Sequence, residues 1–132
     1  MRQKTPAQLK KDLDSVFSKH LRLKYADKNG FCTCYTCGVR KYWKEIHAGH
    51  FIPRNILITR WDEGNCRPQC VGCNLFGNGK VLDFEDHLVK DFGRKVVDKL
   101  KASRFTIMKV DSVWYEKQIE HYKKELSTVL DI

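Results

Sequence analysis

The segments Cys34-Tyr-Thr-Cys37-Gly38 and Cys70-Val-Gly-Cys73-Asn74 decide how this chain of 132 residues folds. In each segment two residues separate the cysteines, so one tight turn can present both thiolates to the same ion. Four sulfur ligands favour zinc, and a shell closed by four protein ligands leaves no position for a water molecule. The spacing therefore predicts a structural zinc ion with no part in catalysis. Its four ligands are Cys34, Cys37, Cys70 and Cys73.

The other cysteines, Cys32 and Cys66, lack this spacing, and we rank them as packed or spare thiols. The chain has no apolar run long enough to span a bilayer, and its N-terminus lacks the apolar region of a secretory signal. We therefore expect a cytoplasmic protein without membrane contact. In that reducing compartment, six cysteines are better explained by metal binding than by disulfides.

Residues with catalytic chemistry lie between and after the cysteine pairs. His47-Ala-Gly-His50 falls in a stretch with strand character, Asn65 follows in the next loop, and Asn74 comes directly after Cys73. This order of a histidine on a strand, an asparagine in a loop and an asparagine opening a helix resembles the ββα-metal motif of HNH (His-Me finger) nucleases. The resemblance implies an α+β fold with a zinc-stapled ββα core.

The same resemblance assigns a role to three residues. His50 would be the general base, because a neutral imidazole with a pKa near ~6.5 can take a proton from water at physiological pH. Asn65 would hold the loop and orient the His50 ring. Asn74 would offer its amide oxygen to a catalytic magnesium or manganese ion, which would stabilise the charge that develops on the phosphate.

One position departs from the HNH pattern. These enzymes often place a metal-binding Asp or His directly before the catalytic histidine, where this chain has Gly49. His47 is the closest replacement, although side chains alternate between the faces of a strand and His47 would need a bulge to reach the same ion. Water is the alternative ligand.

The resemblance becomes more specific over longer runs. These are Ala48-Gly-His-Phe-Ile-Pro-Arg54, Arg60-Trp-Asp-Glu-Gly-Asn-Cys-Arg-Pro-Gln-Cys-Val-Gly-Cys-Asn74 and Gly77-Asn-Gly79. With the basic N-terminal segment and a helix near the end, they make most of the chain similar to the phage NinG family, also called Rap recombination endonucleases. Membership implies a structure-selective nuclease of Holliday junctions, D-loops and related branched DNA. The arrangement also resembles junction resolvases of the phage endonuclease VII type, which act as dimers.

Charge independently favours a polyanionic partner. The chain has 25 Lys and Arg against 16 Asp and Glu, a formal net charge of +9 and a pI near 9.3. The basic excess lies in residues 1–28 and 94–109, and we expect DNA as the partner. Basic residues around the motif are candidates for phosphate contacts. They are Arg54, Arg60, Arg67 and Lys80.

Helical patterns flank the cysteine-rich centre. Thr5-Pro-Ala-Gln8 is a capping box with Pro at the first helical position, and it predicts a helix from about Pro6 to Lys28 that Asn29-Gly30 closes. We expect a single domain over residues 1–132. It comprises a basic N-terminal helix in 1–30, the zinc-bound HNH core in 31–80 and a helical part in 81–132.

Other expected elements are short. Two β-prone runs, Ile46–Ile52 and Ile56–Trp61, could pair as a hairpin. After them we expect helices at 83–92 and 94–103, divided at Gly93, and an extended stretch at 105–110.

The last segment carries an apolar stripe at helical spacing, formed by Tyr115, Ile119, Tyr122, Leu126 and Val129. The stripe predicts a helix that packs on another helix, either in the core of the monomer or as the seam of a dimer. A two-fold enzyme would present two active sites to a four-way junction, so we expect a homodimer.

Two alternatives remain open. A non-catalytic zinc-ribbon module would bind nucleic acid or a protein partner with the same cysteines, and Gly49 favours it. A sequence-specific HNH homing or restriction enzyme would need an additional recognition domain, for which the chain lacks room.

Overall fold

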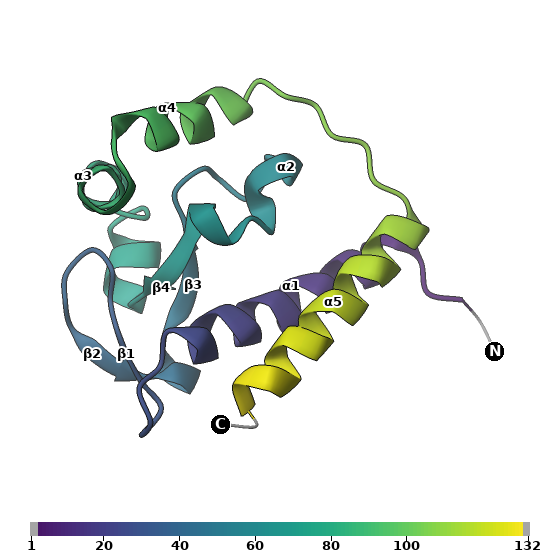
Figure 1. The fold of residues 1–132 in the computed structure, drawn as a ribbon, viewed down its shortest axis with the longest axis horizontal. Helices are drawn as coiled ribbons and strands as arrows, with labels where there is room; N and C mark the ends of the chain where they lie inside the picture. Colours follow the sequence, from purple (N-terminus) through teal and green to yellow (C-terminus); the bar gives the residue numbers. More distant parts are fainter. Residues whose placement is uncertain (1–2, 131–132) are drawn as a thin grey trace.

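The computed structural model describes residues 3–130 and consists of helices around two small antiparallel sheets (Figure 1). The elements, with η for short helices that are not α-helical, are α1 (Pro6–Lys24), β1 (Phe31–Thr33), β2 (Arg40–Tyr42), η1 (Trp43–Glu45), β3 (His47–His50), α2 (Leu57–Arg60), η2 (Glu63–Asn65), β4 (Cys66–Gln69), η3 (Gly72–Phe76), α3 (Val81–Phe92), α4 (Arg94–Ser103) and α5 (Ser112–Leu130). The outermost residues of the expected 1–132 domain lie outside this description.

Helix α1 begins where the capping box predicts. The Gln8 N–H donates to the Thr5 hydroxyl at 3.2 Å, and the Thr5 N–H donates to the Gln8 side chain at 2.8 Å. The helix ends at Lys24 and not at the predicted Lys28. Beyond it the Asp27 carboxylate accepts from the backbone N–H groups of Asn29 and Phe31, and such local bonds compete with continuation of a helix.

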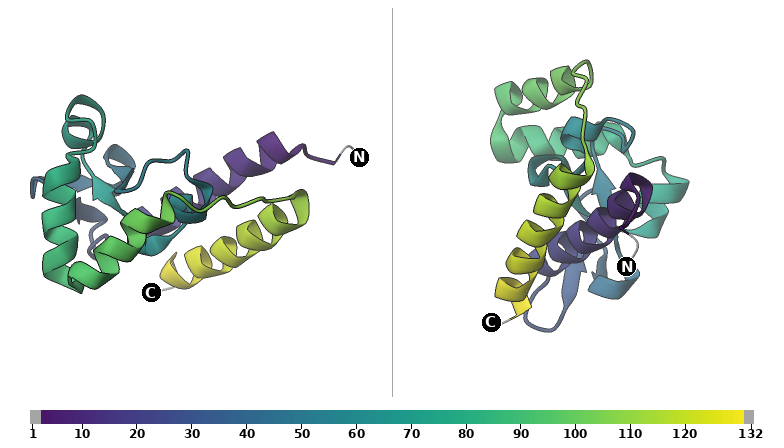
Figure 2. Two further views of the ribbon diagram at one scale, coloured as in Figure 1. Left: turned by 90° about the horizontal axis from the view of Figure 1, so that it is seen from above. Right: turned by 90° about the vertical axis from the view of Figure 1, so that its right-hand side faces the viewer.

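Helices α1 and α5 lie side by side and run in the same direction (Figures 1 and 2). Their contact buries Phe17 against Tyr122, with the two rings edge to face at a centroid distance of 5.0 Å. Tyr115 and Ile119 are buried in the same cluster. The predicted C-terminal helix is confirmed, and Tyr115, Ile119 and Tyr122 of its stripe pack within the monomer, whereas Leu126 and Val129 are half-buried.

The central hairpin differs from the predicted one. Strand β3 pairs with β4, whereas the expected partner run, Ile56–Trp61, contains the short helix α2. The prediction was wrong because the preference of β-branched residues for strands is weak against tertiary contacts. Here the Asn65 side chain donates to the Thr59 carbonyl, and Asp14 on α1 accepts from the side chains that end the segment.

Helices α3 and α4 cover the end of the core away from α5 (Figure 1). Gly93 divides them as predicted, with a φ of 92° that glycine adopts readily. Their inner faces pack on residues that follow β3. Residues 105–110, expected to be extended, carry no strand. No helix within residues 3–130 is long and apolar enough to cross a membrane.

Candidate active site

The cysteines of the two pairs meet at one point, where their four sulfur atoms lie within 4.8 Å of one another and could hold a metal ion. Cys37 Sγ and Cys70 Sγ are 3.7 Å apart, close to the ~3.8 Å that tetrahedral Zn–S bonds of ~2.3 Å impose. The Cys70 N–H donates to Cys34 Sγ at 3.3 Å. Burial opposes ionisation of Cys34, but this and neighbouring hydrogen bonds lower its pKa to about 6, which favours the thiolate that a metal requires.

Cys32 and Cys66 lie outside this cluster of four. The Cys32 thiol donates to the Arg22 carbonyl at 3.1 Å, and Cys66 is fully buried in the core beside α1. Burial raises the pKa of both thiols, so both stay protonated at neutral pH. Their environments suit packed residues.

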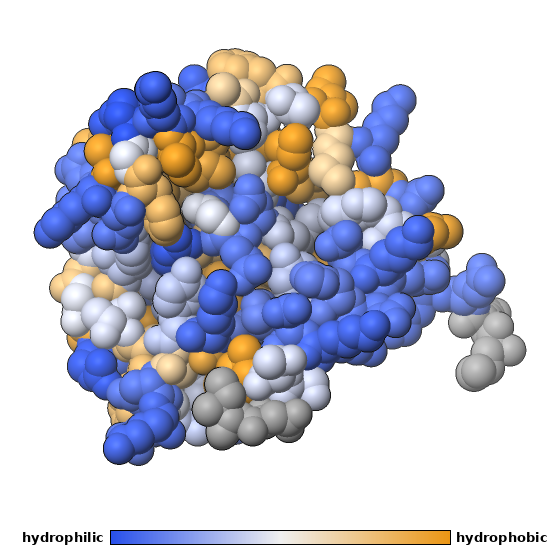
Figure 3. All heavy atoms as spheres, viewed as in Figure 1, coloured by the Kyte–Doolittle hydropathy of each residue, from blue (hydrophilic) through white to orange (hydrophobic). Residues whose placement is uncertain are grey.

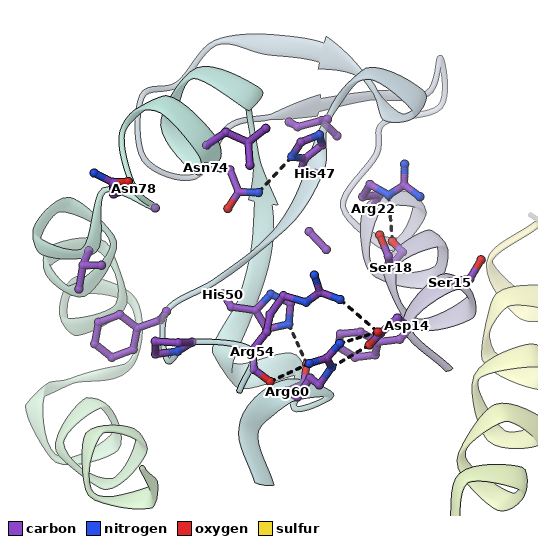
Figure 4. A pocket seen from close by; sticks show the side chains of 18 of the residues that line it. Asp14, Ser15, Ser18, Arg22, His47, His50, Arg54, Arg60, Asn74 and Asn78 are labelled. Carbon is purple, nitrogen blue, oxygen red and sulfur yellow. Dashed lines mark hydrogen bonds and ion pairs between the residues drawn. The ribbon is translucent and has the colours of Figure 1, made fainter. Parts of the chain in front are cut away.

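A cleft of about 700 Å³ lies along β3, with α1 on one side and the turn after the second cysteine pair on the other (Figure 4). Strand β3 brings His47 and His50 to the cleft, and η3 brings Asn74. The loop after β3 adds Arg54, and α1 adds Asp14. The predicted base and the predicted metal ligand therefore face one cleft, which ends beside the cysteine cluster.

His50 is held by the end of helix α2. Its Nε2 lies 2.8 Å from the Arg60 carbonyl oxygen (Figure 4). Because a carbonyl only accepts, Nε2 carries the proton and Nδ1 keeps the free lone pair of a neutral ring. Burial lowers the pKa of His50 below its usual value, and the positive charges of Arg54 and Arg60 act in the same direction. The ring is therefore neutral and able to accept a proton near pH 7.

Asp14 anchors the residues that hold His50, and no local sequence pattern predicted this role. Its carboxylate accepts from Arg60 Nε at 2.9 Å, from the Trp61 indole at 2.8 Å and from Arg54 at 3.1 Å. Burial opposes ionisation, but the hydrogen bonds and charge of Arg60, with Trp61 and Arg54, outweigh it and lower the pKa of Asp14. An ionised Asp14 thus ties α1 to the peptide that carries the Arg60 carbonyl.

Asn65 holds the loop between β3 and β4. Its side chain is fully buried, accepts from the Ile52 N–H at 2.7 Å and donates to the carbonyls of Ile52 and Thr59 at 3.0 and 3.1 Å. The His50 ring is bonded to Arg60 and not to Asn65. Asn65 therefore acts on the ring through the loop that carries Arg60.

Asn74 and His47 are in direct contact across the cleft. The Asn74 amide nitrogen lies 3.0 Å from His47 Nδ1 (Figure 4), and since the amide nitrogen only donates, Nδ1 is unprotonated. Gly49 cannot be replaced by a ligand-bearing residue, because a Cβ there would lie 2.7 Å from the Cβ of buried Gln69. Of the two histidines on β3, His47 is the one beside Asn74.

The predicted phosphate contacts differ in exposure. Arg54 and Arg60 both pair with Asp14, but Arg54 lines the cleft with 58% of its side chain exposed, whereas Arg60 is 11% exposed. Arg67 is buried and donates to the carbonyls of Glu63 and Cys66, so its guanidinium faces the interior. Lys80 is exposed before α3 and outside the cleft lining. The cleft lining also contains two cations that we did not predict as phosphate contacts, Arg22 and Lys44.

Comparison with known families gives one result that covers nearly the whole chain. The family model described as Bacteriophage Lambda NinG protein matches residues 1–130. The match includes both cysteine pairs, β3 and the cleft residues. Searches among curated proteins and among solved structures returned no match.

Proposed function

Since the chain belongs to the family of the bacteriophage lambda NinG protein, we propose that it is an HNH-type, metal-dependent endonuclease that hydrolyses phosphodiester bonds in branched recombination DNA. The observation that carries the proposal is the cleft that His50 and Asn74 share beside the four-cysteine cluster. Zinc in that cluster would hold the turn that carries Asn74. The antiparallel β3–β4 pair followed by η3 supports an HNH-like order of elements.

The mechanism begins with His50. Its Nδ1 takes a proton from a water molecule, which then attacks the phosphorus of the bound strand. The P–O bond to the other part of the strand breaks, and the leaving oxygen takes a proton from solvent. The Arg60 carbonyl holds Nε2–H throughout and stabilises the imidazolium that forms. Arg54, at the mouth of the cleft, binds a phosphate oxygen with its planar guanidinium. After cleavage His50 returns the proton to solvent.

Asn74 would hold the catalytic magnesium or manganese ion through its amide oxygen, the kind of ligand that suits these ions. His47 Nδ1 accepts from the Asn74 amide nitrogen, so this hydrogen bond would have to break before Nδ1 could bind the ion as a second ligand. When bound, the ion supplies electrostatic stabilisation for the charge that develops on the phosphate. Water would supply the remaining ligands, because the buried Gln69 side chain leaves no room for a ligand-bearing side chain at position 49.

The test uses zinc-loaded protein, a labelled four-way junction and a linear duplex of the same sequence. Added magnesium or manganese should produce nicks in the junction, and omission of both should abolish them. His50→Ala should lower the cleavage rate about 100-fold or more, the ordinary contribution of a general base, without loss of junction binding.

One observation favours a second function, a zinc-ribbon module that binds branched DNA without cutting it. Gly49 and the packed Gln69 leave the cleft with fewer ligands than an HNH centre often has. The same experiment separates the two functions. If wild type and His50→Ala bind the junction equally and neither cuts with magnesium or manganese, the binding module replaces the nuclease.

A further inference from the structure

Large apolar side chains are exposed where the second cysteine turn leads into α3. Phe76 is 85% exposed and Leu82 81%, and Leu75 and Val81 are also exposed. We call these four residues the apolar lip. Leu75 and Val81 line the cleft that holds His50 and Asn74, whereas Phe76 and Leu82 lie next to them in sequence and outside the cleft lining. The lip therefore begins at the rim of the candidate active site and extends beyond it.

The lip is held rigidly despite its exposure. The Gly77 N–H donates to the Gly72 carbonyl at 2.7 Å and the Gly79 N–H to the Cys73 carbonyl at 2.9 Å, which fixes the turn to the cysteine cluster. A Cβ on Gly77 would lie 2.9 Å from the Cys73 carbonyl oxygen. A rigid turn that exposes a phenylalanine is a feature of binding surfaces more than of ordinary loops.

The rest of the rim has the opposite character. Arg22, Lys44 and Arg54 line the same cleft. Arg22 donates to the carbonyls of Ser18 and Trp43, so Lys44 and Arg54 are the more accessible cations, and such cations bind phosphates. A ligand that meets both parts must carry anionic groups next to apolar faces. Unpaired nucleotides have this chemistry, because their bases are free to stack on side chains, whereas stacking within a duplex covers the base faces.

We propose that the apolar lip stacks on unpaired bases next to the phosphate held in the cleft, and so selects branched or single-stranded DNA over duplex. This inference rests on the proposed function for the position of the phosphate. A second copy of the chain is a poorer occupant, because each copy carries a net charge of +9 and the lip adjoins basic residues. Like charges would oppose burial of one lip against another.

The chain offers a matched control for the lip. Phe105 is 77% exposed in the connector between α4 and α5 and does not line the cleft. Apolar side chains of that region gather along the upper edge of the face drawn in Figure 3, over α4 and the connector. Loss of Phe105 removes as much exposed aromatic surface as loss of Phe76 without touching the rim.

The experiment measures binding of zinc-loaded protein without magnesium or manganese, so that no strand is cut. The probes are a splayed duplex with 2-aminopurine at its first unpaired position and a fully paired duplex. Phe76→Ala should weaken binding of the splayed DNA about tenfold, the scale of one lost base–aromatic stack, and should leave duplex binding unchanged. Wild-type protein and Phe76→Trp should quench the 2-aminopurine, and Phe105→Ala should behave as wild type.

Three outcomes would overturn the inference: equal weakening of both DNA probes by Phe76→Ala, no effect on either, or a change of oligomeric state in sedimentation. Because nothing is cut in this experiment, its result is independent of the nuclease proposal. If the protein never cuts DNA but Phe76→Ala abolishes its preference for splayed DNA, the proposal for the lip stands and the proposed nuclease activity is wrong. If cutting requires His50 but Phe76→Ala keeps the preference for splayed DNA, only the proposal for the lip is wrong.

Discussion

At the level of single residues, the orientation of His50 depends on a carboxylate from a distant helix. Asp14 bonds the side chains of Arg60 and Trp61, and the carbonyl between these two residues accepts from His50 Nε2. Arg60 is nearly enclosed, so its guanidinium needs this partner. Removal of one member of a shielded ion pair costs more than the pair itself contributes.

Asp14→Asn should therefore lower both stability and catalytic rate. The neutral amide leaves Arg60 without a counter-charge, and we expect a loss of about 2 kcal/mol in the free energy of unfolding. The carbonyl that holds His50 loses its anchor, so kcat should fall about tenfold or more while KM for the junction changes little. Urea unfolding and steady-state kinetics measure the two effects.

Asp12→Asn is the matched control, since it makes the same change on the same helix. Asp12 pairs with Lys4 in an exposed position, where ion pairs contribute little. It should leave kcat unchanged. A fall in kcat of equal size in both variants would mean that α1 acts through its charge and not through the Arg60 carbonyl.

His50 should also set the pH dependence of cleavage. Its pKa is lowered by burial and by the nearby arginines, and only the neutral ring accepts a proton. The cleavage rate should rise with pH through a midpoint below about 6.5 and stay level from about pH 7 upward. Arg54→Ala removes one positive charge and should move the midpoint upward. A midpoint that stays fixed when His50 is replaced by Ala, in whatever activity remains, would assign the titration to another group.

At the level of elements, the cysteine cluster reinforces a contact between two parts of the chain that also meet through a hydrogen bond from the Tyr35 N–H to the Pro68 carbonyl. It connects the turn between β1 and β2 to the turn that opens η3. Structural zinc contributes about 10–16 kcal/mol of apparent binding free energy, as much as the whole stability of an ordinary domain. Without the ion, the turn that carries Asn74 would lose this anchor.

Cys37→Ser should accordingly abolish stoichiometric zinc binding and lower the midpoint of thermal unfolding by well over ten degrees. Removal of zinc from the wild-type protein with a chelator should lower the midpoint by about the same amount. Cys32→Ser is the control, because a serine hydroxyl can still donate to the Arg22 carbonyl that the Cys32 thiol now contacts. It should keep its zinc. Atomic absorption measures the zinc content, and circular dichroism measures thermal unfolding. A Cys37→Ser protein that folds stably without zinc would contradict the stabilising role of the cysteine cluster.

The helices and strands also differ in how well local sequence patterns predicted them. Regular periodicity and caps predicted α1, α4 and α5 because these depend on neighbours along the chain. The run Ile56–Trp61 was misassigned because its conformation depends on Asn65 and Asp14, which act from other parts of the fold. A local sequence pattern carries no information about either contact.

The candidate site divides in the same way. The cysteine pairs, His50 and Asn74 are recognisable by type and spacing. The structure places the four sulfur atoms together and lines one cleft with His50 and Asn74. The predicted free arginines were only partly correct, because Arg60 and Arg67 donate to internal acceptors. Exposure of a basic residue depends on its acceptors in three dimensions, which spacing alone does not determine.

For the molecule as a whole, the open question is where its positive charge meets DNA. The excess in residues 1–28 and 94–109 lies on two helices, α1 and α4, and the segments next to them, and the face drawn in Figure 3 is largely hydrophilic over α1 and α5. Part of the charge is neutralised internally, as where Arg94 pairs with Glu85. Net charge alone therefore does not locate the bound strand.

Salt dependence can locate it. Each cation that binds a phosphate releases counterions, so its loss lowers the slope of log Kd against log salt by about 0.9 on duplex DNA and about 0.7 on single strands. Arg54→Ala should produce this change, because Arg54 faces the cleft. Arg94→Ala, with a similarly exposed side chain outside the cleft lining, should not. If both variants lower the slope equally, DNA contacts the basic surface broadly, and no phosphate is bound specifically in the cleft. If Arg94 alone matters, the strand runs over α4 and His50 cannot reach it.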